Sequence, residues 1–172
     1  AKEPEINDLA EYLRKMGAKI EGDGTSLIKI QGVNQLKATD HTVIPDRVEA
    51  GTLIIAAAIT HGQVTVKNCN PKHLESFLHK LEESGVKMEL GKDSVTVLKS
   101  SGYKGVDMAT GPYPGYPTDL QAQFMTLMTE ANGISVIKET VFENRFMHVQ
   151  ELNRLAADIT ISANTAIIHG EP

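Results

Sequence analysis

The 172-residue chain has the length of one ordinary domain, or of one domain with part of a second. It is 41% hydrophobic and 23% charged, which is typical of soluble globular proteins, and its formal net charge is −5. The acidic balance argues against a nucleic-acid surface, and no apolar run approaches the roughly 20 residues that span a bilayer. No signal peptide opens the chain, and its single cysteine, Cys69, agrees with a reducing compartment, so we expect a cytoplasmic protein.

A repeated pattern of helix and strand runs along the chain. Residues 3–20 resemble residues 70–88, because each segment reads as an amphipathic helix, a glycine and a short strand, and Gly17 and Gly85 lie 68 residues apart. A third copy covers residues 147–161. A second kind of helix, residues 46–60 and 118–131, ends near Gly62 and Gly133, which lie 71 residues apart. Asn70 and Asp46 suit N-caps, and Gly85 suits a left-handed residue after a helix.

These elements predict two and a half βαβαββ units and therefore an α/β fold built from repeats. Residues 42–100 read as strand, helix, strand, helix, strand, strand, and residues 103–170 repeat that order. Residues 1–32 supply the last helix and two strands of an earlier unit. We expect the boundary within residues 33–42, with residues 1–41 and 42–172 in different domains. The alternative is an unrepeated α+β domain whose helices happen to look alike.

A loop with three prolines and two glycines, residues 111–117, leads directly into a predicted helix. Thr118 and Gln121 match a capping box, and Asp119 falls in the first turn. Asp119 could stabilise the positive end of the helix dipole, or it could be a general base for a substrate hydroxyl. The residues by themselves leave both readings open and favour the first.

The segment 139–149 follows a strand and has neither a helical nor a strand period, as is common in ligand-binding loops. The structural alternative is a capped connection in which Asn144 caps the next helix and Glu143 pairs with Arg145. The histidines and Cys69 have no metal-ligand spacing, so the sequence predicts no metal site. Cys69 reads as a small buried thiol.

These motifs resemble the signatures of the enolpyruvyl transferases, and in particular of the UDP-N-acetylglucosamine 1-carboxyvinyltransferases. The resemblance rests on four segments in order, residues 4–20, 45–52, 117–124 and 139–149, and it extends along nearly the whole chain. It implies an inside-out α/β barrel of βαβαββ units, three per domain, with the active site between two domains. It also implies that the chain is less than half of a full-length member.

The resemblance implies transfer of enolpyruvyl from phosphoenolpyruvate to the 3′-hydroxyl of UDP-N-acetylglucosamine, toward peptidoglycan, without a cofactor. It gives Asp119 the roles of sugar-binding residue and base, and it gives Val141 a backbone contact with the same substrate. Thr118, Phe142, Asp46 and Arg47 are further candidates at the site. The partners implied are the two substrates and the remainder of the parent chain, with no nucleic acid or membrane.

The main departures from the family pattern concern regions that these 172 residues do not contain. The family's catalytic cysteine loop and the arginines that hold the two anionic substrates have no match here, and Cys69 does not correspond to that cysteine. We therefore expect the chain to be inactive alone. Within the third-copy helix, Leu155-Ala156-Ala157 departs from the usual Met-Gly-Ala. The alternatives are a non-catalytic binding or regulatory module of the same fold and a relative of 5-enolpyruvylshikimate-3-phosphate synthase.

Overall fold

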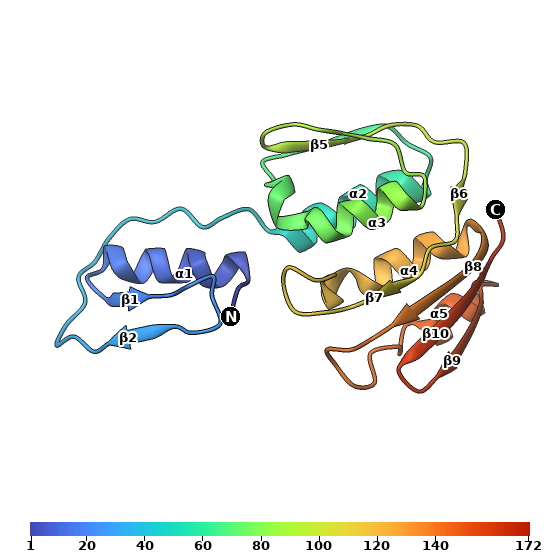
Figure 1. The fold of residues 1–172 in the computed structure, drawn as a ribbon. Helices are drawn as coiled ribbons and strands as arrows, with labels where there is room; N and C mark the ends of the chain where they lie inside the picture. Colours follow the sequence, from blue (N-terminus) through green and yellow to red (C-terminus); the bar gives the residue numbers. More distant parts are fainter. The chain divides into compact units, whose positions relative to one another are not determined.

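The computed structural model describes all 172 residues and divides into two compact units, Ala1–Pro45 and Asp46–Pro172 (Figure 1). The division falls between Pro45 and Asp46, a few residues after the expected boundary at residue 41. The two units are described separately. Their assignment to two different domains of a longer enzyme is still a proposal.

The first unit contains one helix and one antiparallel strand pair, as expected for the end of a repeat. The elements are α1 (Pro4–Lys15), β1 (Lys19–Glu21) and β2 (Lys29–Gln31). The unit buries little apolar surface, since Ala10 and Ile20 are buried but Ile30 is 71% exposed. The segment after β2 has no regular structure, and the contact of His41 Nε2 with Asp8 Oδ1, at 2.9 Å, holds its end near α1.

The first copy of the repeat in the second unit lacks the strand that we predicted from Thr42 onward. The copy consists of α2 (Arg47–Ile59), β3 (Val64–Lys67), η1 (Pro71–Leu74), α3 (Glu75–Glu83), β4 (Met88–Leu90) and β5 (Ser94–Val97). Residues 42–45 are irregular, and Val43 is 72% exposed. The prediction was wrong because β3 pairs only with β5, so no neighbouring strand hydrogen-bonds to residues 42–45.

The second copy has every predicted element, although its first strand is split into two short pieces. The elements are β6 (Tyr103–Lys104), β7 (Met108–Ala109), η2 (Thr118–Leu120), α4 (Gln121–Thr129), β8 (Ala131–Lys138), α5 (Val149–Arg154), β9 (Asp158–Ser162) and β10 (Thr165–Gly170). Both β6 and β7 run parallel to β8.

The two copies share strand order and register. The sheets have the orders β3-β5-β4 and β8-β10-β9, and all these neighbours are antiparallel. Val66 pairs with Val95 in the first sheet, and 71 residues later Ile137 pairs with Ala166 in the second. One-residue slips would turn buried side chains outward, so this agreement shows that the sequence repeat is also a structural repeat.

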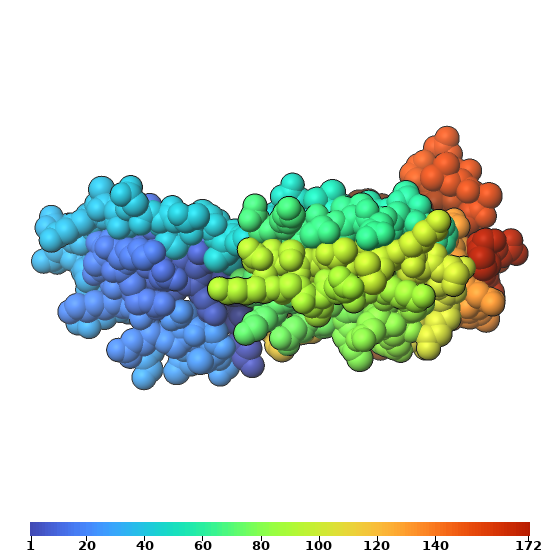
Figure 2. Space-filling model, turned by 90° about the horizontal axis from the view of Figure 1, so that it is seen from above, coloured from blue at the N-terminus to red at the C-terminus, as the bar shows by residue number.

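Three helices of the second unit, α2, α3 and α4, lie between its two sheets. In Figure 1, α2, α3 and α4 occupy the space between the sheet that contains β5 and the sheet that contains β8. Figure 2 shows the outer side of the first sheet, where residues 64–100, in green to yellow-green, form much of the surface. Ile54, Phe77 and Phe124, one from each helix, are completely buried. These three helices are therefore inside and the sheets outside, as the predicted fold class requires.

Candidate functional site

Asp119 lies in the first turn of η2, after the proline-rich loop. The loop is closed by hydrogen bonds from Gly111 N to Tyr116 O and from Gly115 N to Pro112 O, at 2.9 and 2.7 Å. The buried Tyr116 hydroxyl donates to Leu120 O, so the loop is anchored to the helix that follows it. These contacts fix the backbone position of Asp119 and therefore the point from which its side chain extends.

The predicted capping box at this helix does not form. Pro117 occupies the N-cap position and supplies no side-chain bond, while the Gln121 Nε2 atom is buried without a partner. The Thr118 hydroxyl instead donates to Glu139 Oε2 at 2.8 Å. The prediction was wrong because the Thr118 hydroxyl donates to the buried carboxylate of Glu139, which follows a distant strand, and not to the backbone of its own helix.

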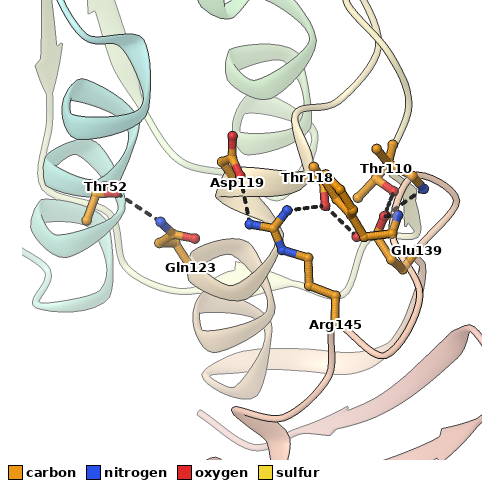
Figure 3. Close-up of polar contacts among 9 residues, drawn as sticks. Thr52, Thr110, Thr118, Asp119, Gln123, Glu139 and Arg145 are labelled. Carbon is orange, nitrogen blue, oxygen red and sulfur yellow. Dashed lines mark hydrogen bonds and ion pairs between the residues drawn. The ribbon is translucent and has the colours of Figure 1, made fainter.

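Asp119 forms an ion pair with Arg145, which the sequence had suggested would pair with Glu143. Arg145 Nη2 lies 2.7 Å from Asp119 Oδ1, and Arg145 Nη1 donates to Thr118 Oγ1 at 3.2 Å (Figure 3). The guanidinium also lies 5.0 Å from the centre of the Phe142 ring. The Asp119 side chain is 52% exposed, and its Oδ2 atom accepts no hydrogen bond from the protein. This oxygen is therefore available to a ligand.

Glu139 is the main site residue that sequence reasoning missed. It is 2% exposed, and its Oε1 atom accepts from Thr110 Oγ1, Val141 N and Phe142 N at 2.7, 2.8 and 3.1 Å. Its Oε2 atom accepts from Thr118. A signal was present, because strand alternation places residue 139 on the same face as the completely buried residues 135 and 137.

The charged form of Glu139 is stabilised despite burial. Burial has the largest single influence and raises the pKa of Glu139, but the bonds from Thr110, Val141, Thr118 and Phe142 together outweigh it. The pKa therefore lies below its usual value, and the group is a carboxylate at neutral pH.

Val141 and Phe142 begin an exposed loop beside this carboxylate. Their backbone N–H groups are both used by Glu139, so the backbone carbonyl of Val141 is the group left for a ligand. Residues 139–146, together with Ala163 and Asn164, line a hollow of about 470 Å³. Asn144 has a positive φ of 56° and does not cap α5, whose N-cap is His148, so that predicted cap was also wrong.

The remaining candidates have identifiable structural contacts. Asp46 caps α2, accepting from Val48 N and Glu49 N at 2.7 and 3.1 Å, as predicted. Arg47 lies 5.5 Å from the centre of the Tyr113 ring, in the proline-rich loop. Cys69 is buried, and burial raises the pKa of its thiol, as expected for an unreactive core residue.

No group of three or more His, Cys, Asp or Glu side chains is arranged to hold a metal ion. No helix is long and apolar enough to cross a membrane.

Comparisons with known proteins agree on one family. The family model described as EPSP synthase (3-phosphoshikimate 1-carboxyvinyltransferase) matches residues 1–172. The UDP-N-acetylglucosamine 1-carboxyvinyltransferase of Bdellovibrio bacteriovorus is 60% identical over the whole chain, and that of Koribacter versatilis is 54% identical over 99% of it. The chain spans 42% and 40% of the lengths of these two relatives.

Solved structures show the same fold. The enolpyruvyl transferase NikO from Streptomyces tendae matches 98% of the chain, and 40% of its own length, with a TM-score of 0.86 and 26% identity. An EPSP synthase from Acinetobacter baumannii matches 96% of the chain and 39% of its own length, with a TM-score of 0.54 and 16% identity, which is evidence for the fold alone. The predicted fold class is thereby confirmed. The chain belongs to the enolpyruvyl transferase family whose model is described as EPSP synthase (3-phosphoshikimate 1-carboxyvinyltransferase).

Proposed function

We propose that these residues form part of an enzyme that transfers enolpyruvyl from phosphoenolpyruvate to the 3′-hydroxyl of UDP-N-acetylglucosamine, without a cofactor. The similarity to UDP-N-acetylglucosamine 1-carboxyvinyltransferases, at 52–60% identity over at least 99% of the chain, supports this acceptor. The alternative acceptor, a phosphorylated shikimate, has less support, since the EPSP synthase structure is only 16% identical. The product would be a peptidoglycan precursor made in the cytoplasm, which would connect the activity to cell-wall growth and division.

The observation that carries the proposal is the arrangement of Asp119 and Arg145 beside the loop at Val141. In this proposal Asp119 binds the sugar and takes the proton of its 3′-hydroxyl through the free Oδ2 atom. Arg145 holds the other carboxylate oxygen and so fixes the direction of Oδ2. The Val141 carbonyl accepts a hydrogen bond from the same substrate. The hydroxyl oxygen then bonds to the enolpyruvyl carbon, and phosphate leaves.

The charge of the chain indicates that other residues must bind the anionic groups. Both proposed substrates carry phosphate, yet the chain has 17 Lys and Arg against 22 Asp and Glu. One of the cations near the site, Arg145, is already paired with Asp119. Transition-state charge needs preorganised donors around it. We therefore propose that the remainder of a longer chain supplies this clamp, and that residues 1–172 alone do not catalyse transfer.

Phosphate release tests the proposal. A full-length chain, meaning one of the relatives' length that contains residues 1–172 unchanged, is incubated with phosphoenolpyruvate and UDP-N-acetylglucosamine. We expect phosphate and enolpyruvyl product from the full-length chain and neither from the 172 residues alone.

Turnover with 3-phosphoshikimate in place of the nucleotide sugar would assign the chain to the alternative acceptor. No turnover with either acceptor, in a folded full-length chain, would identify a non-catalytic binding module. Turnover by the 172 residues alone would show that the clamp is not needed from elsewhere.

A further inference from the structure

Glu139 connects three segments that carry the proposed substrate contacts. Its carboxylate receives hydrogen bonds from residue 110 after β7, from residue 118 at the start of η2 and from the backbone of residues 141 and 142. Thr110 and Thr118 lie 29 and 21 residues before Glu139 in the sequence. A buried carboxylate with four donors is costly to move, because leaving it or its donors unpaired carries a desolvation penalty.

The hydrogen bonds that link Arg145 to Glu139 through Thr118 have only one consistent direction. The guanidinium can only donate, so Thr118 Oγ1 must accept from Arg145 Nη1. The ionised Glu139 can only accept, so the Thr118 hydroxyl hydrogen must point to Glu139 Oε2. The second nitrogen of the same guanidinium then meets Asp119 Oδ1. Figure 3 shows this chain from Glu139 through Thr118 and Arg145 to Asp119.

We propose that Glu139 is a positioning residue for the acceptor site, acting through Thr118 and Arg145 to orient Asp119 and through the loop backbone to orient the Val141 carbonyl. Glu139 itself does not touch the substrate, because it is 2% exposed and its oxygens are already occupied. The inference rests on the proposed function. It adds Glu139 as a residue that sets the geometry of the acceptor site. It also predicts that Glu139 has no effect on the binding of phosphoenolpyruvate.

The test measures kcat and the KM of each substrate in the full-length chain. Glu139→Gln keeps the size of the side chain and can accept from Thr110, Val141 and Phe142 through its amide oxygen. Its NH₂ group, however, would face Thr118 Oγ1 and leave the threonine hydroxyl hydrogen without an acceptor. Since small misplacements at a reaction centre can cost about 10²-fold, we expect kcat/KM for the nucleotide sugar to fall about 10- to 100-fold. The KM for phosphoenolpyruvate should stay within about twofold.

A second pair of variants keeps the test decisive if Glu139→Gln does not fold. Thr118→Val removes the hydroxyl link at nearly constant volume, and Thr118→Ser keeps the link. We expect the valine variant to show the same selective loss and the serine variant to recover most of it. Because both changes interrupt one chain of contacts, Glu139→Gln combined with Thr118→Val should cost no more than the worse single change.

The control is Glu151→Gln, which removes the same charge from an exposed pair with Arg154 on α5 and should leave the kinetics unchanged. Equal losses for both substrates, additive effects, or Thr118→Val at wild-type activity would overturn the inference. These results are interpreted by comparison with a wild-type chain that is active. A wild type inactive with UDP-N-acetylglucosamine would instead refute the proposed function.

Discussion

The two copies of the repeat have the same strand register but place their acidic residues differently. In the first copy β3 is joined to η1 by residues 68–70 only, and Asp46 is used as the cap of α2. In the second copy the equivalent connection is residues 139–148, and Asp119 caps nothing. The longer connection carries Glu139 and Arg145, which reach back to η2.

The comparison indicates how a repeated scaffold can carry the proposed site without a change in its sheets. Asn68, which lies 71 residues before Glu139, adopts a positive φ of 54° and turns the chain directly into η1. In the second copy the chain continues into an exposed loop instead. Loops tolerate insertion better than strands do, so the longer connection can carry additional polar side chains while the paired strands keep their register.

The largest effect should separate the two acidic residues. Asp119→Asn in the full-length chain should reduce kcat by about 10²- to 10⁴-fold, because Asp119 is the proposed base and this is the usual cost of losing a positioned base. Asp46→Asn should leave kcat nearly unchanged, because asparagine is an equally good N-cap. Steady-state kinetics with matched thermal melts measure both. Equal effects of the two substitutions on kcat would contradict the functional distinction between the copies.

Hydrogen exchange should distinguish the partial copy in the first unit from the first copy in the second unit. A two-stranded sheet is marginal by itself, and Ile30 in β2 is 71% exposed, whereas Val95 and Val97 in β5 are buried. In the isolated 172-residue chain, amides of β1 and β2 should exchange at least about tenfold faster than those of β5, a difference of ~1.4 kcal/mol in opening free energy. Equal protection in a proven monomer would show that the first unit is stabilised by contacts beyond its own strands.

A tight packing contact between the two copies gives a stability test. A Cβ atom on Gly51 of α2 would lie 2.5 Å from Leu120 Cδ1 of η2, so Gly51→Ala should lower the free energy of unfolding by about 1–3 kcal/mol. The matched control is Gly62→Ala, whose Cβ would meet its nearest atoms at 3.4 Å, and its effect should be below about 1 kcal/mol. Urea unfolding gives both values. A neutral Gly51→Ala would mean that the two copies do not pack tightly at this point.

Equivalent helix ends carry a glycine in one copy and an alanine in the other. Gly85 and Ala156, 71 residues apart, both have positive φ, at 95° and 74°. Because a Cβ is disfavoured in this region, Ala156→Gly should stabilise the protein by about 1 kcal/mol and Gly85→Ala should destabilise it by about as much. A Cβ on Gly85 has only ordinary contact, 3.8 Å from Gly102 O, so the backbone alone sets its cost. Shifts of the same sign in calorimetry would refute this explanation.

The smallest effect concerns the pH dependence of stability. The folded-state pKa of Glu139 is lowered from its usual 4.5, so its stabilising contribution is complete above that value and is lost as pH falls through the lower folded pKa. The difference in unfolding free energy between wild type and Glu139→Gln should therefore be constant near neutral pH and shrink below about pH 4.5. A difference that stays constant to pH 3 would show that the four donors do no more than offset the cost of burying the carboxylate.

Much of the fold followed from local patterns in the sequence. The helical spacing of apolar residues located α1 and α3, the matching segments that end near Gly62 and Gly133 located α2 and α4, and the caps at Asp46 and Asn70 formed as predicted. The glycine offset of 71 residues anticipated the shared strand register, because register depends on turn lengths and on which face is buried. The strand expected from Thr42 failed, since a strand also needs a neighbour to bond with.

The side-chain partners at the site were decided by tertiary structure alone. The sequence singled out Asp119, Thr118 and the segment containing Arg145, but it paired Thr118 with Gln121 and Arg145 with Glu143, both close neighbours in the chain. In the structure Thr118 bonds to Glu139, 21 residues away. Arg145 bonds to Asp119 and to Thr118, which are 26 and 27 residues away. Periodicity and capping act within a few residues and can be read locally. A buried carboxylate takes whatever donors the folded backbone brings within about 3 Å, and only the three-dimensional path of the loop after β8 determines which donors those are.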